Sequence, residues 1–208
     1  MYSELRQYIS SLNPDGISAS RRQILQPFAA QLHEKLSSEG RENVNLNFIC
    51  THNSRRSVLA QVWAKTISTY YGIEKIQCYS GGTEVTAVFP EIISTFQRVG
   101  FNVKKAHDTM NPVYHISYGD DYPSIVAFSK RWDDEVNPSK NFTAIMTCAH
   151  ADENCPLILG AEARIPLTYE DPKEYDGSSM MEEKYEERSR QIASEMAYVF
   201  GEVASLSE

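Results

Sequence analysis

Cys50 and Arg56 lie six positions apart, with Ser57 directly after them, in a segment suited to chemistry on a tetrahedral oxyanion. The reactive form of a cysteine is the thiolate, which a helix N-terminus stabilises through its partial positive charge and its free N–H groups. Arg56 can direct two N–H groups at one anion, and it stays charged at any working pH. The Ser57 hydroxyl can donate to the sulfur. The spacing therefore predicts that Cys50 attacks an oxyanion held by Arg56.

The residues between Cys50 and Arg56 must form a tight loop, and we expect their backbone N–H groups to surround the oxyanion. Asn53 suits such a loop because asparagine tolerates the left-handed region of backbone space. The predicted oxyanion-binding residues are Thr51, His52, Asn53, Ser54, Arg55 and Ser57. A plainer interpretation is a buried cysteine at the end of a strand, followed by two exposed arginines at the start of a helix.

Regular elements on both sides must position this loop. An apolar run at residues 45–49 predicts a strand before Cys50, and the pattern of residues 56–71 predicts a helix after it. Further strands are predicted at 74–79, 142–147 and 164–167, and further helices at 90–99 and 180–204. This alternation predicts an α/β fold with a central four-stranded parallel sheet flanked by helices. Such sheets bind ligands beyond the carboxyl ends of their strands, where Cys50 and Cys148 both fall.

Two further segments are additions to this core. Residues 1–42 are predicted to form an N-terminal helical extension, and the catalytic domain is predicted to span residues 43–208. Within the extension, Pro27 should kink or restart the second helix. Two β-like runs at residues 113–118 and 124–129, separated by a turn segment, predict a β-hairpin insertion.

The composition limits the classes of function. Hydrophobic residues make up 41% of the 208 residues, enough for the core of one domain with additions. A net charge of −8 and an isoelectric point near 5.2 argue against general nucleic-acid binding. No apolar run approaches the length that spans a membrane, and the first residues lack the apolar stretch of a signal peptide. We therefore expect a cytoplasmic protein whose cysteines are reduced at rest.

Cys148 and Cys155 form a second notable pair, seven positions apart, after the predicted strand at 142–147. On one rigid helix they would lie roughly 10 Å apart, so they could bridge only if the segment loops out. A metal site would use both cysteines and His150, but that spacing matches no common zinc pattern. The other interpretations are two small buried side chains or a redox pair. Cys78, which has no partner by spacing, is predicted to lie in the core.

The segment from Phe48 to Ser57 resembles the signature loop of the low-molecular-weight protein tyrosine phosphatase family. It is most similar to the branch of thioredoxin-coupled arsenate reductases. Residues 80–85 and 147–156 resemble two further segments of these proteins, in the same order along the chain. The likeness spans about residues 44–206 and implies the phosphatase-like fold.

The resemblance also implies a role for each residue of the site. Cys50 would be the nucleophile, and Cys148 and Cys155 would carry away the disulfide that arsenate reduction leaves on it. Family members have an acidic residue before a proline in the loop after the last strand, which corresponds here to Asp171 before Pro172. Asp171 would then be the general acid. A thioredoxin-like reductant would restore the thiols, and no cofactor or metal ion is implied.

Three functions are compared at this point, with arsenate reduction as the leading hypothesis. A phosphatase would hydrolyse an aryl phosphomonoester through a phosphocysteine and would need only Cys50, Arg56 and Asp171. The candidates for a tyrosine rim that recognises phosphotyrosine are Tyr114, Tyr118, Tyr122 and Tyr169. A non-enzymatic oxyanion sensor would tolerate the loss of Cys50 and Asp171, so the presence of both argues against it.

Two positions depart from the family pattern. Gln61 stands where some arsenate reductases have the glutamate of a potassium site, so no potassium ion is predicted although Asn53 is kept. Arg55 stands where these proteins often have a cysteine, which makes the loop more basic.

Overall fold

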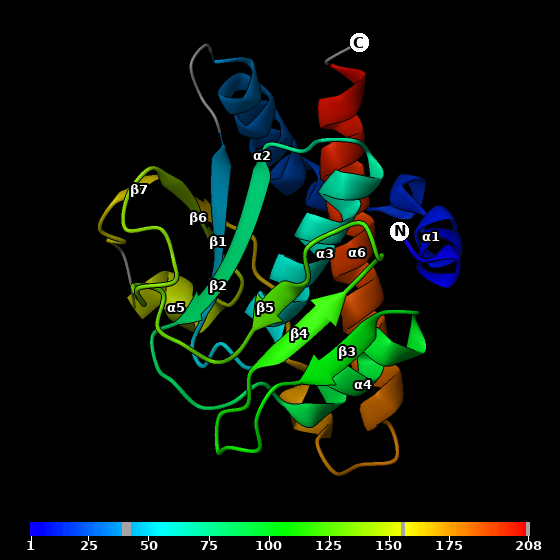
Figure 1. Cartoon of the computed structure of the whole chain (residues 1–208). Helices are drawn as coiled ribbons and strands as arrows, with labels where there is room; N and C mark the ends of the chain where they lie inside the picture. Colours follow the sequence, from blue (N-terminus) through cyan, green and yellow to red (C-terminus); the bar gives the residue numbers. More distant parts are fainter. Residues whose placement is uncertain (39–42, 155–156, 207–208) are drawn as a thin grey trace.

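Four parallel strands form the central sheet of the computed structural model, which describes residues 1–38, 43–154 and 157–206 (Figure 1). Their order in space is β2-β1-β6-β7. The strands are β1 (Val44–Cys50), β2 (Ile76–Gly82), β6 (Phe142–Met146) and β7 (Ala161–Pro166). Every residue of β6 is buried, in keeping with its largely apolar sequence. The predicted four-stranded parallel sheet is confirmed.

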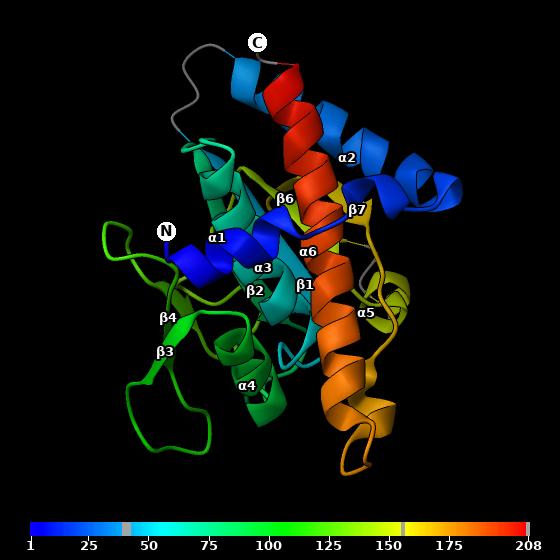
Figure 2. The ribbon, with the colours of Figure 1, turned by 90° about the vertical axis from the view of Figure 1, so that its right-hand side faces the viewer.

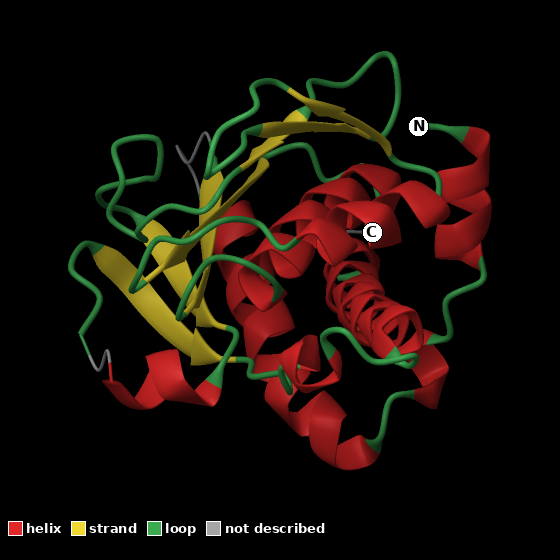
Figure 3. Ribbon diagram, turned by 90° about the horizontal axis from the view of Figure 1, so that it is seen from below, coloured by secondary structure: helices red, strands yellow, loops and turns green. Residues whose placement is uncertain are grey.

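Helices cover one face of this sheet in a thick layer (Figure 2, Figure 3). They are α1 (Ser3–Ser10), α2 (Ala19–Ser37), α3 (Arg56–Tyr70), α4 (Pro90–Arg98) and α6 (Met181–Ser205), and the 3₁₀ turns are η1 (Pro14–Gly16) and η2 (Pro172–Tyr175). The short α5 (Ala149–Asn154) and the side chains of Trp132 and Ile158 pack on the opposite face. No helix in the described ranges is long and apolar enough to cross a membrane.

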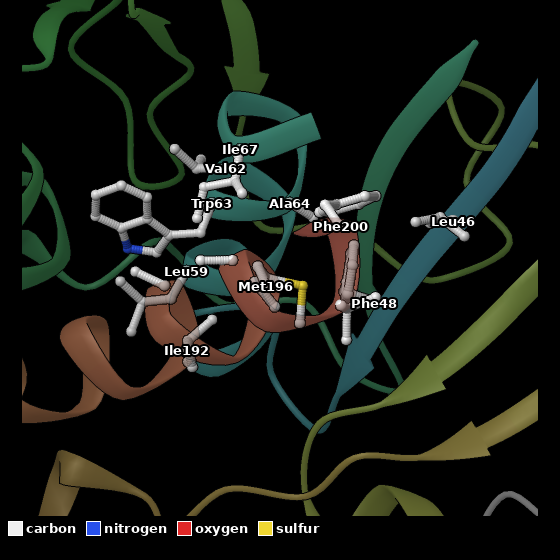
Figure 4. Close-up of a cluster of buried hydrophobic side chains, with 14 of the residues drawn as sticks. Leu46, Phe48, Leu59, Val62, Trp63, Ala64, Ile67, Ile192, Met196 and Phe200 are labelled. Carbon is white, nitrogen blue, oxygen red and sulfur yellow. The ribbon is translucent and has the colours of Figure 1, made fainter. Parts of the chain in front are cut away.

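The main core lies where α3 and α6 pack against β1 (Figure 4). Phe48 of β1 meets Met196 and Phe200 of α6. Trp63 of α3 is fully buried, and its indole N–H donates to the Ser189 hydroxyl at 2.9 Å. Burial of one phenylalanine-sized side chain contributes about 1.5–3 kcal/mol. This cluster therefore fixes α3, and with it the helix start that follows Cys50.

The N-terminal helices share this core instead of forming one of their own. Leu5 of α1 and Phe28 and Leu32 of α2 are fully buried in the same cluster. Arg21 of α2 donates twice, at 2.9 Å, to the buried carboxylate of Glu195 in α6. Side-chain packing joins the segments before and after residue 42. The predicted domain boundary at this residue therefore stays a prediction.

Helix α2 runs from Ala19 to Ser37 through Pro27, so the predicted restart at this proline is wrong. Proline removes one backbone hydrogen bond from a helix. The buried face of α2 offsets that loss, since most of the stability of a helix in a protein comes from tertiary packing. The Ser18 hydroxyl also caps the helix by accepting the Arg21 backbone N–H at 3.3 Å.

A second sheet of three antiparallel strands, in the order β3-β4-β5, is added beside the first. Its strands are β3 (Asn102–Lys105), β4 (Tyr114–Ser117) and β5 (Ile125–Ala127). β4 and β5 form the predicted hairpin. β3 was not predicted because only Val103 is partly buried in it, so its sequence has no apolar pattern. β5 ends early because Ser129 and Lys130 leave the sheet to bond the loop after Cys50.

Strand β2 continues to Gly82, three residues beyond its predicted end, and Gly82 pairs in register with Cys50. The reason is close backbone approach. A Cβ on Gly81 would lie 2.3 Å from the Cα of Trp132, which no side chain could accept. These glycines therefore let a neighbouring segment pack on the strand, instead of ending it with a turn.

Replacement of Phe28 by alanine tests whether the N-terminal helices and the rest of the core unfold together. Loss of this buried ring should lower the free energy of unfolding by about 3–5 kcal/mol, in a single cooperative transition followed by chemical denaturation. Ile24→Ala, at a position 42% exposed on the same helix, is the control and should cost less than about 1 kcal/mol. A separate early transition for α1 and α2 would contradict the shared core.

Candidate active site

Cys50 is the last residue of β1, and α3 begins at Arg56. We call residues 50–57 the Cys50 loop. The loop turns at Asn53, whose φ of 46° lies in the left-handed region, as its sequence predicted. Asparagine adopts this conformation at less cost than most residues because its short polar side chain bonds locally. The Cys50 side chain is buried, so a substrate must enter the loop to reach the sulfur.

A chain of hydrogen bonds leads through this loop to the Cys50 sulfur. The Lys130 backbone N–H donates to Asn53 Oδ1 at 3.1 Å, and Asn53 Nδ2 donates to Ser57 Oγ at 2.8 Å. Ser57 Oγ lies 3.1 Å from Cys50 Sγ. When Cys50 is ionised, Ser57 must be the donor of that pair, because a thiolate has no proton to give. The chain therefore holds a donor against the thiolate.

Neighbouring segments hold the loop by its carbonyl groups. The Thr83 N–H donates to the Cys50 carbonyl at 3.2 Å, and the Glu84 N–H donates to the Thr51 carbonyl at 2.8 Å. The Ser129 hydroxyl donates to the His52 carbonyl at 2.8 Å, and the Phe89 N–H donates to the Ser54 carbonyl at 3.1 Å. For the backbone N–H groups of residues 51–55, no hydrogen bond is found within the described part of the chain. These N–H groups are therefore available to donate hydrogen bonds to an oxyanion bound within the loop.

Arg56 lies between the loop and the predicted acid. Its Nη2 donates to Asp171 Oδ2 at 2.5 Å, and its Nη1 donates to the Tyr169 carbonyl at 3.0 Å. Its Nε–H is buried and has no hydrogen-bond partner among the described residues. Such a donor is costly to leave unsatisfied, and a bound oxyanion would supply the acceptor. Asp171 is itself oriented by the Lys173 backbone N–H, which donates to Oδ1 at 3.1 Å.

The side chains of Arg55 and His52 lie against groups outside the loop. Arg55 donates through Nε to the Tyr185 hydroxyl and through Nη2 to the Asp176 carboxylate, both at 2.5 Å. Burial and the hydrogen bond to Asp176 raise the pKa of Tyr185 well above its usual range. His52 Nδ1 lies 3.3 Å from Glu84 Oε2. The oxyanion contacts predicted for Arg55 and His52 therefore stay predictions for their backbone N–H groups alone.

Cys148 lies at the edge of the Cys50 loop, just after β6. Ile49 pairs with Met146, so the two cysteines follow adjacent ends of neighbouring parallel strands. Cys148 is 1% exposed and belongs to the same apolar cluster as Cys50. Its Sγ lies 3.5 Å from Thr51 Oγ1. The fold thus brings a second buried thiol to the loop, as the positions of both residues at strand ends predicted.

The other cysteines differ from this pair. Cys155, with its predicted redox role, lies outside the described residues. Cys78 is partly buried and packs against the main core, where it was predicted to lie, and burial raises the pKa of its thiol to about 12. It is therefore a poor nucleophile at neutral pH. In the described ranges, no group of three or more His, Cys, Asp or Glu side chains is arranged to hold a metal ion.

Three of the four tyrosines predicted as candidates for a rim are buried in the protein. Tyr114, Tyr118 and Tyr169 are 8%, 1% and 4% exposed. Tyr118 stacks on Tyr122 with ring centroids 5.2 Å apart. Its carbonyl accepts the Tyr2 backbone N–H, so Tyr118 lies beside the first residues of the chain. The predicted rim is therefore wrong for Tyr114, Tyr118 and Tyr169. Tyr169 serves the site through its carbonyl, which orients Arg56.

Sequence reasoning missed the residues that hold the Cys50 loop from outside. Ser129 and Lys130 carry no recognisable motif, and the contacts of Arg55 with Asp176 and Tyr185 join residues more than a hundred positions apart. No local sequence pattern predicts such partners. Only residues 80–85, which include the donors Thr83 and Glu84, carried a signal, through their resemblance to a family segment.

The chain is similar in sequence to a known protein family and to several known proteins. The model of the family described as low molecular weight phosphotyrosine protein phosphatase matches residues 45–154. An arsenate reductase of Bacillus cereus is 26% identical over 149 residues, covering 70% of this chain and 91% of that protein. Arsenate reductase 2 of Staphylococcus epidermidis is 27% identical over 125 residues, covering 60% and 76%.

A solved structure supports the likeness at the level of the fold. A low molecular weight phosphotyrosine phosphatase of Vibrio cholerae superposes with a TM-score of 0.52 over 80% of this chain and 98% of that one. Its sequence identity is 16%. At this identity the likeness shows that the two chains share the fold.

Replacement of Gly82 by alanine should weaken the binding of inorganic phosphate at least about tenfold, because the loop donors would be displaced. The added Cβ would lie 2.7 Å from the Thr51 carbonyl oxygen and 2.8 Å from the Asn53 backbone nitrogen. Isothermal titration calorimetry measures the affinity. In the control Gly201→Ala, the nearest atom would be Tyr71 Oη at 3.4 Å, so binding should not change. A folded Gly82→Ala variant with normal phosphate affinity would exclude the predicted strain.

Proposed function

The chain belongs to the low molecular weight phosphotyrosine protein phosphatase family, and we propose that it reduces arsenate to arsenite. It is an enzyme, because both the family and the relatives named arsenate reductase are enzymes. One observation favours reduction over ester hydrolysis. Cys148 is buried beside the Cys50 loop, 3.5 Å from the Thr51 hydroxyl. A reduction that ends in a disulfide needs such a second thiol, whereas ester hydrolysis does not.

In the first step arsenate occupies the hollow of the Cys50 loop. The backbone N–H groups of residues 51–55 and the buried Nε–H of Arg56 bind its oxygens. The Cys50 thiolate attacks arsenic, so that an S–As bond forms while an As–O bond breaks. Asp171 donates a proton to the departing oxygen, which leaves as water. Ser57 stabilises the thiolate before the attack.

The contact with Arg56 places Asp171 next to the bound oxyanion. In the structure the Arg56 guanidinium pairs with the Asp171 carboxylate at 2.5 Å, and the Tyr169 carbonyl accepts a second N–H of the same guanidinium at 3.0 Å. An oxyanion held by Arg56 therefore lies beside the residue that is proposed to protonate its leaving group.

The reduction itself moves two electrons from sulfur to arsenic. Cys148 Sγ attacks Cys50 Sγ, the S–As bond breaks, and its electron pair leaves with arsenic as arsenite. A Cys50–Cys148 disulfide remains. Cys155 then attacks Cys148 and releases Cys50 as a thiolate, leaving a Cys148–Cys155 disulfide. A dithiol reductant of the thioredoxin type returns this pair to thiols, and we place the reaction in the cytoplasm, where such reductants keep cysteines reduced.

Phosphatase activity is the second candidate. It is favoured by the contact of Arg56 with Asp171, since these two residues and Cys50 suffice to form and release a phosphocysteine. An aryl phosphate would bind as arsenate does, and Asp171 would protonate the leaving phenolate. The same site can therefore carry out both reactions, and Cys148 discriminates between them.

Replacement of Cys148 by serine should abolish arsenate turnover, by at least about a hundredfold, because the arsenic adduct on Cys50 then has no internal thiol to reduce it. The assay is arsenate-dependent consumption of NADPH through thioredoxin and its reductase. Cys78→Ser is the control and should keep full turnover, since Cys78 has no part in the relay. Undiminished arsenate turnover in Cys148→Ser would overturn the proposed reduction, and loss of arsenate turnover with intact hydrolysis of p-nitrophenyl phosphate would support it.

Replacement of Asp171 by asparagine should lower kcat for phenyl phosphate about 10²–10⁴-fold, because the phenolate then leaves without a proton. Glu170→Gln is the matched control. Glu170 is exposed and pairs with Arg188 at 3.3 Å, so kcat should stay within about twofold. Equal losses in the two variants would exclude Asp171 as the specific acid.

A further inference from the structure

A pocket of about 380 Å³ lies away from the Cys50 loop, between the two sheets. β2 is an edge strand of the parallel sheet and β5 an edge strand of the antiparallel one, and the pocket is lined by residues of both. The two edges lie side by side over α3 (Figure 1). None of residues 50–57 lines the pocket. Its size is within the range of sites for small organic molecules.

Gln61 of α3 holds the two edges apart at a fixed distance. Its Nε2 donates to the Cys78 carbonyl of β2 and to the Val126 carbonyl of β5, both at 3.3 Å. Its Oε1 accepts the Ser80 hydroxyl at 2.6 Å. All polar atoms of this buried side chain are thereby used within the protein. The three hydrogen bonds of Gln61 fix the positions of β2 and β5 relative to each other, so the pocket between them is a defined feature of the fold.

Lys130 brings a buried positive charge to this pocket. The side chain is 3% exposed, and its Nζ lies 4.6 Å from the centroid of the Phe128 ring. No hydrogen bond or ion pair of this ammonium is found among the described residues, and Asp134 acts on it only from beyond ion-pair distance. Burial lowers the pKa of Lys130 to about 8. A buried cation without a close counter-ion is costly, and an anionic ligand would relieve that cost.

The remaining lining suits the apolar body of such a ligand. Val126 and Val136 are 42% and 52% exposed at the pocket, and the Phe128 ring forms part of its wall. Lys65 adds a second cation, whose Nζ donates to the Ile76 carbonyl at 2.8 Å. No aspartate or glutamate is among the residues that line the pocket. In a chain of net charge −8, this local excess of positive charge is selective for anions.

We propose that this pocket is a second ligand site, which binds a small aromatic or branched aliphatic carboxylate. The carboxylate pairs with Lys130, and the apolar body lies against Phe128, Val126 and Val136. A single charged contact at the inner end and apolar walls around it are typical of sites for small organic acids. The inference does not depend on the reaction catalysed at Cys50.

The pocket wall is also part of the support of the Cys50 loop. The Lys130 backbone N–H holds Asn53 Oδ1, and the Ser129 hydroxyl holds the His52 carbonyl. A ligand that draws the Lys130 side chain towards it acts on the same segment. Occupancy of the pocket should therefore change the affinity of the Cys50 loop for phosphate, and phosphate should change the affinity of the pocket by the same factor.

The test is calorimetric titration of the full-length protein with 2-naphthoate, and with 2-naphthalenemethanol as the neutral analogue. The proposal expects saturable binding of 2-naphthoate with a Kd of about 1 mM or tighter. The Lys130→Met variant, which keeps the volume of the side chain, and the neutral analogue should each bind at least about tenfold more weakly. Lys104→Met, at an exposed lysine of β3, is the matched control and should bind as the unmodified protein does.

A second pair of variants guards against misfolding of Lys130→Met. Val136→Glu places a carboxylate at the exposed mouth of the pocket and should also weaken 2-naphthoate binding, whereas Val85→Glu, at a position 51% exposed outside it, should not. No saturable binding, equal binding by Lys130→Met and the unmodified protein, or binding abolished by Cys50→Ser would each overturn the proposal. The last result would assign the carboxylate to the Cys50 loop.

Discussion

The hydrogen bond from the Lys130 backbone N–H to Asn53 Oδ1 is the constraint on which the candidate site depends. It holds a non-glycine residue at a φ of 46°, a conformation that costs roughly 1–2 kcal/mol. The two hydrogen bonds of the Asn53 side chain offset this cost at about 1 kcal/mol each. In this conformation the loop binds its neighbours through its carbonyls and keeps its N–H groups for an anion. It also places the Ser57 hydroxyl against the Cys50 sulfur.

The charged groups around the loop come from elements that lie far apart in the sequence. Arg56 at the start of α3 meets Asp171, and Arg55 meets Asp176 and Tyr185 near the start of α6. These contacts hold only if α3 and α6 keep their relative positions. The apolar cluster between them provides that rigidity, and the N-terminal helices extend it through buried side chains and an ion pair with α6. The described residues of the extension therefore support the site from a distance, through the core that they share with α6.

One segment, residues 128–130, serves two faces of the protein. Its backbone and the Ser129 hydroxyl hold the Cys50 loop, while the Phe128 and Lys130 side chains line the pocket between the two sheets. After β5 the chain leaves the sheet, so that the Lys130 N–H and the Ser129 hydroxyl face the loop while the Phe128 and Lys130 side chains face the pocket. The proposed chemistry at Cys50 and the proposed carboxylate site are thus joined by a short, well-bonded stretch of chain. Cys148 is separate from it, on the opposite side of β1 from β2.

The sequence by itself determined the features that depend on neighbours along the chain. The spacing of Cys50, Arg56 and Ser57, the turn at Asn53 and the alternation of strands and helices are local patterns, and the parallel sheet and the left-handed residue follow from them. Only the tertiary structure decided which way Arg55 points, where Tyr118 lies and how far β2 extends. Each of these depends on a partner distant in sequence, and the free energy of such a contact arises only when packing brings the two groups together.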